Sequence, residues 1–497
     1  MKKTALPAVR LGAILLAGSS LLSRLLGVLR DHVFAQIFGL GLDAYYLAFR
    51  IPDLLYTLLI LGALSSAFIP LYTRLNVKDP REGDRFASQV LNAVFLALLL
   101  LAGFLFLLAP WLLPILAPGF SAVDVQTAVD LTRLMLLSPI FLGLSGVLQG
   151  IENVHKKFWG MALAPILYNV SIISAAWFFG PEYGVYGLAW GVILGAFLHF
   201  LVQLPGAIFT PFHYRFAMPG WTKTVKEFFT LALPRVFGMA AAQLTLVVDY
   251  ALASTLSLGA VSVYSYSLNL QSFPYGVVAV SFSVAVFSTL AEQALKANKT
   301  EFVSTLRRSF QAIWFLAFPA VVGLFLLREP VIELILQGGS FDADAARQTT
   351  ETFAILIWAA LPQSLIPLWS RAFYSLSNTR TPVLIAVFTM LLNVGLSLFL
   401  LRVLNWPVYG LAVSNLVSGS FNALLLLAFL KRDLKTAWSS LLPIKDILLA
   451  LFATLVMSLC VYYLERFNYP HLAIELGVTA GLGACAYFLV SKLSHKS

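Results

Sequence analysis

The chain has 497 residues, of which 60% are hydrophobic and 11% charged, and its mean hydropathy is +0.86. Soluble domains carry about 25% charged residues, so this composition excludes a soluble protein and indicates an all-α polytopic membrane protein. The net charge of +10 comes without a basic, aromatic-interleaved soluble face, which argues against a nucleic-acid partner.

The first stretch of interest, residues 19–72, places charged side chains inside apolar sequence. Four of its residues fall on one face of a helix: Ser20, Arg24, Gly27 and Asp31. A buried arginine at the bilayer centre costs at least about 2.5 kcal/mol. This polar stripe therefore cannot face lipid, and we expect it to line a cavity or to pair with other groups.

The following span continues the pattern. It carries three polar residues at intervals of seven, namely Asp43, Arg50 and Thr57. Pro52 stands between Arg50 and Asp53 and removes a helix hydrogen bond, so the sequence predicts a kink beside these charges. The first span is not expected to be a cleaved signal peptide, because no small-residue cleavage site precedes its charges.

Apolar runs close to the roughly 20 residues that span a bilayer divide the whole chain. We place fourteen transmembrane helices, at residues 11–31, 44–72, 88–114, 127–150, 159–180, 184–206, 226–254, 260–291, 307–327, 350–374, 382–402, 408–430, 444–464 and 471–491. With both termini in the cytoplasm, the inside loops and tails, counted with the span ends next to them, hold 23 of the 33 Lys and Arg residues, and the outside loops, counted in the same way, hold four. This asymmetry follows the positive-inside rule, and an odd number of spans would destroy it.

A five-residue match indicates an internal repeat. The sequence VYGLA at residues 185–189 recurs at 408–412, an offset of 223 residues. Six predicted spans separate equivalent points, so the copies share one orientation, as in transporters built from parallel repeats. The two six-helix halves and an appended pair of helices are assigned to residues 1–206, 207–430 and 431–497.

The six basic residues that remain are arginines within the predicted spans: Arg24, Arg30, Arg50, Arg133, Arg235 and Arg371. Pairing with Asp31, Asp53 and Asp249 would leave an excess of positive charge. The excess favours a cavity for an anion such as phosphate, which a guanidinium binds through two donors. We predict substrate-binding roles for Arg24, Arg30, Asp31, Arg50, Arg235 and Arg371, with a purely structural role as the alternative. Arg133 is near a helix end and is expected to snorkel.

Asp249 stands alone among apolar residues in LTLVVDYALAS. Such a carboxylate is protonated, paired across helices or bound to a cation. Asn393, with Ser397 one turn later, offers neutral oxygen ligands of the kind that sodium takes. We predict that Asp249 and Asn393 bind sodium as a coupling ion, and we expect no other cofactor.

Motifs of enzymes are weak in this sequence. It contains no GxxxxGK[ST] phosphate loop, which argues against an intrinsic ATP-driven pump. The acidic run FDADA at 341–345 could be taken for the metal site of a glycosyltransferase, but it lies in a predicted outside loop and is expected to be solvated. We therefore expect a transporter rather than an enzyme.

The first predicted span contains the motif Ser-Arg-Leu-Leu-Gly-Val-Leu-Arg-Asp at residues 23–31. Two further motifs follow in and beside the second span, Asp-Ala-Tyr at 43–45 and Ser-Ala-Phe-Ile-Pro at 66–70. With these motifs the chain resembles the MurJ/MviN lipid II flippases of the multidrug/oligosaccharidyl-lipid/polysaccharide exporter superfamily. The resemblance implies a charged site at Arg24, Arg30 and Asp31 and a sodium site at Asp249 and Asn393.

The chain departs from this family at two positions. Tyr56 and Asn269 stand where the family usually has pyrophosphate-binding arginines. The resemblance thus leaves open whether Arg50, Arg235 or Arg371 replaces them or whether the lipid-linked substrate differs.

The sequence therefore predicts a monomeric flippase of the bacterial cytoplasmic membrane. It would carry lipid II, the undecaprenyl-pyrophosphate-linked peptidoglycan precursor, across the bilayer by alternating access. One alternative is an exporter of another lipid-linked oligosaccharide or a drug/cation antiporter of the same superfamily. The other alternative is a membrane-bound enzyme or a transport-inactive scaffold.

Overall fold

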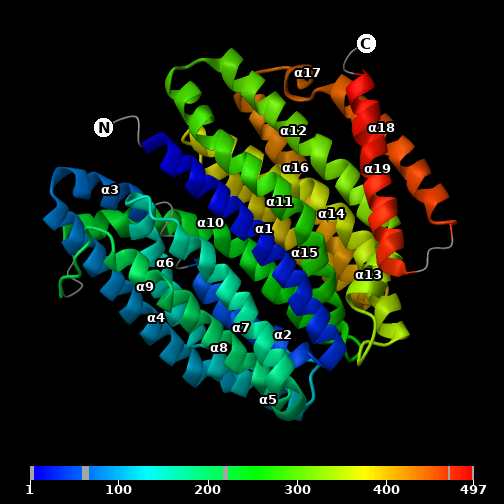
Figure 1. Cartoon of the computed structure of the whole chain (residues 1–497), viewed down its shortest axis with the longest axis horizontal. Helices are drawn as coiled ribbons and strands as arrows, with labels where there is room; N and C mark the ends of the chain where they lie inside the picture. The colour runs from blue at the N-terminus through cyan, green and yellow to red at the C-terminus, as the bar shows by residue number, and fades with distance from the viewer. Residues whose placement is uncertain (1–4, 59–66, 217–221, 468–470, 495–497) are drawn as a thin grey trace. The chain divides into compact units, whose positions relative to one another are not determined.

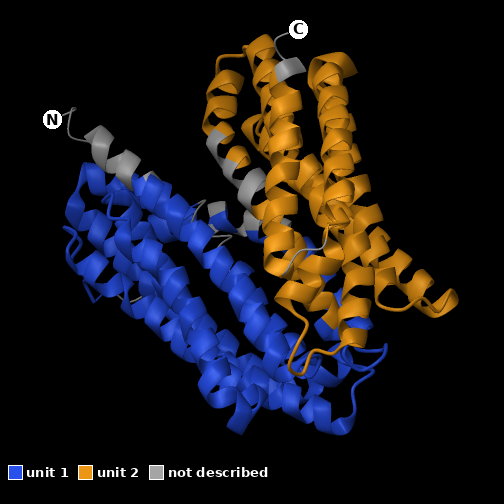
Figure 2. Cartoon of the chain, turned by 45° about the vertical axis from the view of Figure 1, so that its right-hand side comes forward, with its two compact units in different colours: residues 1–262 blue, residues 263–497 orange. Residues whose placement is uncertain are grey.

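The computed structural model describes residues 5–58, 67–216, 222–467 and 471–494. The side chains of some further helical residues, Arg235 among them, lie outside the described part. The described backbone is helical, as predicted, and forms no strand. The chain divides into two compact units, residues 1–262 and 263–497 (Figure 2).

The first unit contains the ten helices from the N-terminus onward (Figure 1): α1 (Ala5–Phe38), α2 (Asp43–Tyr56), α3 (Ile69–Lys78), α4 (Pro80–Leu116), α5 (Ala122–Met135), α6 (Ser138–Val154), α7 (Trp159–Tyr183), α8 (Val185–Leu201), α9 (Gln203–Ile208) and α10 (Lys223–Ala253). Capping side chains set where several of them begin. Asp79 accepts a hydrogen bond from the backbone of Arg81 before Pro80 opens α4, and Ser121 caps α5 through the backbone of Asp124.

The second unit holds most of α11 (Ala260–Leu295) and the helices after it: α12 (Lys299–Leu326), α13 (Arg328–Ile335), α14 (Ala343–Ser375), α15 (Arg380–Leu398), the π-helical turn η3 (Phe399–Val403), α16 (Tyr409–Asp433), α17 (Trp438–Leu441), α18 (Ile444–Leu464) and α19 (Leu472–Ser494). Its largest buried cluster stacks Phe310 and Trp314 of α12 on each other and Phe310 on Trp369 of α14.

Ten helices among the described residues are long and apolar enough to span a membrane, counting α5 with α6, α8 with α9 and α15 with η3. Many of their large apolar side chains are exposed, including Phe104, Trp111, Phe178 and Leu391. Exposed apolar belts of this kind suit a lipid environment. The chain is a multi-pass membrane protein.

Small residues bring α7 and α8 together. Gly184, with φ of +56°, turns the chain between them. Gly187, Gly191 and Gly195 follow at intervals of four, and a Cβ atom at any of them would lie 2.4–2.9 Å from atoms of α7. Close backbone approach at a stripe of small residues is a common way to pack helices in lipid, where the hydrophobic effect does not drive association.

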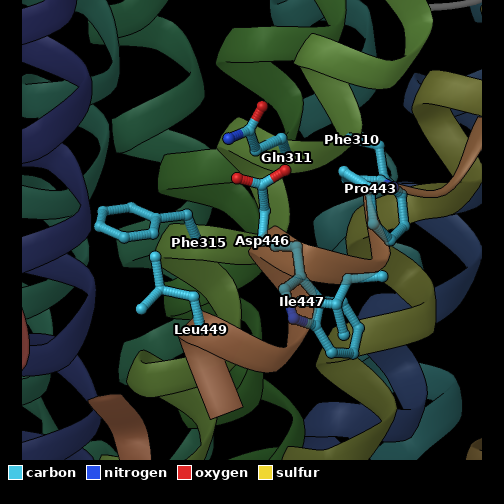
Figure 3. A pocket seen from close by; sticks show the side chains of 8 residues that line it. Phe310, Gln311, Phe315, Pro443, Asp446, Ile447 and Leu449 are labelled. Atoms are coloured by element: carbon cyan, nitrogen blue, oxygen red, sulfur yellow. The ribbon is translucent and has the colours of Figure 1, made fainter. Parts of the chain in front are cut away.

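The last two helices pack against each other and against α12 within the second unit. Tyr487 of α19 donates to the carbonyl oxygen of Phe315 at 2.7 Å. Figure 3 shows a small pocket where α18 meets α12, with the carboxylate of Asp446 near the amide of Gln311. Its volume is about 10 Å³, enough for one water molecule and too small for a substrate group.

Candidate functional site

The charged residues of α1 form one close ion pair and leave one cation unpartnered. Arg30 Nε and Nη2 donate to Asp31 Oδ1 at 3.2 and 2.9 Å, and Asp31 is 3% exposed. Arg24 lies six residues earlier, is half-buried and makes no ion pair or hydrogen bond with a residue of the described part. Arg24 therefore keeps its full complement of donors for a ligand.

Arg50 of α2 is anchored to α10. Its Nη2 donates to Tyr250 Oη at 2.8 Å, and its guanidinium carbon lies 4.1 Å from the centre of the tyrosine ring. Asp53 Oδ2 is 4.0 Å from Arg50 Nη1, which makes a long ion pair. Tyr250, at 1% exposure, thus fixes the arginine by stacking and hydrogen bonding, whereas Asp53 compensates its charge loosely.

Asp43, at the start of α2, ties α2 to the beginning of α11 within the first unit. One carboxylate oxygen accepts from the backbone N–H of Gly259 at 2.8 Å, and the other accepts from the backbone and hydroxyl of Ser262 at 2.8 and 2.6 Å. A carboxylate that accepts backbone N–H groups at a helix start is well placed in the field of that helix.

A pocket of about 330 Å³ lies inside the first unit, among α1, α2, α6, α7 and α8. Its polar lining includes Ser23, Arg30, Asp53, Tyr56, Tyr168, Asn169 and His199. The charges of Arg30 and Asp53 cancel in this lining. The pocket thus combines the ion-paired arginine of α1 with hydroxyl, amide and imidazole groups from four other helices.

In the second unit, side-chain amides form hydrogen bonds between three helices. Gln271 of α11 donates through Nε2 to Gln363 Oε1 of α14 at 2.9 Å, and Gln363 Nε2 donates to Asn415 Oδ1 of α16 at 2.8 Å. Asn269 is half-buried two residues before Gln271. This chain of neutral amides links three helices without placing a charge among them.

The remaining predicted site residues are placed as follows. Arg371 is half-buried in α14, and the side chain of Arg235 in α10 lies outside the described part. Asp249 is 0% exposed in the first unit, and Asn393 is 1% exposed in the second, where its Nδ2 donates to Ser418 Oγ at 3.3 Å. The sodium site at Asp249 and Asn393 stays a prediction.

Arg133 donates to the carbonyl oxygen of Phe106 at 3.1 Å, which satisfies a guanidinium near a helix end.

Sequence reasoning missed Tyr250 as the partner of Arg50, and it missed the pocket residues Tyr168 and His199. The only signal for Tyr250 was its place beside the lone Asp249. Asn169 is a polar residue in an apolar span, and nothing in the sequence tied it to the helix that carries Arg24.

Comparison with known proteins decides the family. A family model described as lipid II flippase MurJ matches residues 34–478. The chain is 32% identical over 430 residues to a probable lipid II flippase MurJ of Bdellovibrio bacteriovorus, covering 84% of this chain and 82% of that protein. It is 30% identical over 434 residues to the lipid II flippase MurJ of Burkholderia cenocepacia, again covering 84% and 82%. The chain belongs to the lipid II flippase MurJ family.

Solved structures agree with this membership. A structure described as lipid II flippase MurJ in an inward closed conformation superposes with a TM-score of 0.81 at 27% identity, covering 97% of this chain and 99% of that one. An inward-facing multidrug resistance MATE family transporter superposes with a TM-score of 0.74 at 13% identity, covering 83% and 94%. The second likeness shows a shared fold alone.

Proposed function

We propose that the protein is a lipid II flippase. The observation that carries this proposal is the family match over residues 34–478, which begins in the last residues of α1, after Arg24, Arg30 and Asp31, and includes all of α2. Translocation of a lipid-linked head group requires no covalent chemistry. The protein binds the head group away from lipid, exposes it to one side and then to the other, and leaves the polyprenyl chain in the bilayer.

The charges of the first unit support an anion site for the pyrophosphate. Arg24 offers an unpartnered guanidinium, while Arg30 and Arg50 already engage Asp31 and Tyr250. Arginine binds phosphate oxygens through parallel N–H donors, and such contacts gain strength where water is excluded. Arg24 is therefore the proposed primary pyrophosphate ligand, and Arg30 and Arg50 of the same unit add positive potential. Arg235 and Arg371 stay proposed substrate-binding residues.

The finer architecture is part of the same proposal. Fourteen transmembrane helices form two parallel six-helix repeats, residues 1–206 and 207–430, followed by a pair of helices at 431–497. The small residues that follow VYGLA support this repeat, since Gly191 and Gly195 in α8 correspond to Ser414 and Ser418 in α16 at the same offset of 223. An even number of spans places both termini in the cytoplasm of a cell with an inner membrane, and the protein acts as a monomer.

Sodium is the proposed coupling ion, with Asp249 and Asn393 as its proposed ligands. Both side chains are almost fully buried and carry oxygen atoms of the kind that sodium takes. Such an ion changes the balance between two conformations only by its different affinity for each.

The proposed function is tested by depleting the protein in its host and following lipid II in each leaflet. Depletion should trap lipid II in the inner leaflet, and wild-type protein should restore its export within the time of re-expression. The matched control is Arg133→Ala, which removes an arginine from the membrane region outside the proposed site. Unchanged lipid II distribution after full depletion would exclude flippase function.

A further inference from the structure

The pocket inside the first unit holds hydrogen-bonding groups that no other described residue satisfies. Asn169 is 8% exposed, and its Nδ2 donates to Ser23 Oγ at 3.1 Å and to the carbonyl oxygen of Pro165 at 3.0 Å. A carbonyl oxygen can only accept, so the orientation of this amide is fixed. Asn169 Oδ1 then lines the pocket as an acceptor without a partner in the described part of the chain.

His199 presents a second acceptor. Its Nδ1 lies 2.8 Å from Ser145 Oγ, and the same hydroxyl donates to the backbone oxygen of His199 at 3.0 Å. Ser145 has one proton, and the backbone oxygen cannot donate, so Nδ1 must carry the proton that it shares with the hydroxyl. The other ring nitrogen, Nε2, is then a bare acceptor on a side chain that is 7% exposed and lines the pocket.

Three more groups in the lining lack a close partner among the described residues. The hydroxyls of Tyr56 and Tyr168 make no hydrogen bond there, and the carboxylate of Asp53 has only the 4.0 Å contact with Arg50. Asp31 accepts from Nε and Nη2 of Arg30 and offsets its charge, which leaves the other N–H groups of the guanidinium as donors. The lining therefore offers both donors and acceptors, the acceptors being those of Asn169, His199 and Asp53, and its formal charges cancel.

The hydrogen-bonding groups of this lining suit one part of a lipid-linked head group better than another. A pyrophosphate has only acceptor oxygens and negative charge, so Asn169 Oδ1, His199 Nε2 and Asp53 would repel it. A sugar ring carries several hydroxyl donors, an acetamido N–H where it is N-acetylated, and C–H faces that suit Phe49. At about 330 Å³ the pocket is at the lower end of the range for small-ligand sites, roughly 300–1,000 Å³.

We propose that this pocket binds an N-acetylated sugar ring of the translocated head group, while the pyrophosphate binds outside it at Arg24. The inference rests on the proposed flippase function and names the part of the substrate that the first unit recognises. Asn169, His199 and Asp53 accept from the sugar hydroxyls and the acetamido N–H, and Tyr56 and Tyr168 donate or accept as the ring requires. Tyr56, where the family resemblance implies an arginine, is then a neutral group that contacts the sugar.

The test compares three ligands on purified protein by native mass spectrometry: lipid II, its peptide-free disaccharide analogue and undecaprenyl pyrophosphate. The variants are Asp53→Asn and Tyr168→Phe, each of which changes one pocket group without changing its size. Their matched controls are Asp130→Asn in α5 and Tyr183→Phe, which lies in the same helix as Tyr168 and is exposed. Melting temperature in detergent checks that each variant is folded.

Each pocket variant should weaken binding of lipid II and of the peptide-free analogue by about tenfold, because one buried hydrogen bond is lost, and neither should weaken binding of undecaprenyl pyrophosphate. An equal loss for all three ligands would overturn the inference, as would a loss confined to the ligand that carries the peptide. A wild type that binds none of the three above a phospholipid control would refute the flippase proposal itself. If wild type binds lipid II and the variants bind equally well, only the sugar pocket is refuted.

A second measurement replaces one lining hydroxyl, that of Ser23, by a thiol and leaves Asn169, His199 and Asp53 in place. Ser23→Cys in a background of Cys460→Ala and Cys485→Ala places a single thiol in the lining, and its maleimide labelling rate is measured with each ligand. Lipid II and the peptide-free analogue should protect the thiol at least fivefold more than undecaprenyl pyrophosphate does. Equal protection by all three ligands would contradict a sugar pocket.

Discussion

In the described part of the chain, the two units arrange polar groups inside the membrane region differently, although the second unit also carries the half-buried Arg371 in α14. The first unit carries arginines and aspartates, with Arg30 paired to Asp31 and Arg50 held by Tyr250. The second unit connects Gln271, Gln363 and Asn415 by neutral amide hydrogen bonds. A charged side chain costs much free energy inside a membrane, so we expect those that are present to have a function. A chain of hydrogen-bonded amides orders helices at a lower cost in free energy. The difference indicates that the anionic end of the substrate is bound by the first unit.

The largest expected effect comes from removing the unpartnered cation of the first unit. Arg24→Ala should abolish complementation of a depleted host while membrane levels stay near normal, because the side chain has no described partner whose loss would weaken the fold. Arg24→Lys should restore function only in part, since lysine keeps the charge but loses the planar fork. Full complementation by Arg24→Ala, with Arg133→Ala as the matched control, would contradict the anion site.

The next effect concerns the arginine that Tyr250 fixes. Tyr250→Phe keeps the stacked ring and removes the 2.8 Å hydrogen bond, so transport should fall about tenfold or more, as expected for one hydrogen bond to a charged group. Arg50→Ala should fall further, because stacking and charge are lost as well. Transport assays in proteoliposomes measure both, and Tyr183→Phe serves as the control. Equal activity of Tyr250→Phe and wild type would show that the hydrogen bond does not position Arg50 for transport.

The sequence could predict the elements of the first unit but not how they meet. Apolar runs and periodicity place Arg24, Arg30 and Asp31 on one helix and Arg50 beside Pro52, and the structure has them in α1 and α2. A helical period says which face a residue occupies and not which helix covers that face. Arg50 and Tyr250 are 200 residues apart, and only tertiary packing brings them together.

The pocket illustrates the same limit. Asn169 and His199 are single polar residues in apolar helices, a pattern that usually marks a packed polar group. Their open acceptors follow from where Pro165 and Ser145 place the other hydrogen bonds, which no local pattern encodes. The amide chain of the second unit was likewise beyond prediction, because its three members come from helices that are far apart in sequence.

A variant of the amide chain tests the comparison in the second unit. Gln363→Leu removes both hydrogen bonds and leaves Gln271 and Asn415 without this partner, which should destabilise the protein by about 1–3 kcal/mol. Affinity for undecaprenyl pyrophosphate should stay within twofold of wild type, because no charge changes. Thermal unfolding and ligand binding are measured on the same preparation, and Gln126→Leu, an exposed position on α5, is the control. A large loss of pyrophosphate affinity without destabilisation would place the anion in the second unit.

The smallest expected effect lies outside the spans and concerns pH. His155 follows α6, and its Nε2 lies 3.0 Å from Tyr72 Oη. Burial lowers the pKa of the His155 imidazole, and the nearby carboxylate of Asp84 opposes that shift. The unfolded chain therefore binds the proton more readily, and stability should fall as the pH drops below about 6.5. The melting temperature of His155→Gln should depend less on pH between 8 and 5.5 than that of wild type or of the control His471→Gln. An unchanged pH dependence would show that protonation of His155 does not contribute to the loss of stability at low pH.

The central claim is that the first unit binds the anionic end of the substrate, and the most direct test is the affinity for undecaprenyl pyrophosphate. Wild type, Arg24→Ala and Gln363→Leu are compared at low and at physiological salt. The account predicts a loss of about tenfold or more for Arg24→Ala, together with a weaker salt dependence, because a charge-assisted contact to phosphate has gone. It predicts near-wild-type affinity for Gln363→Leu. Equal affinity in wild type and Arg24→Ala would contradict the claim.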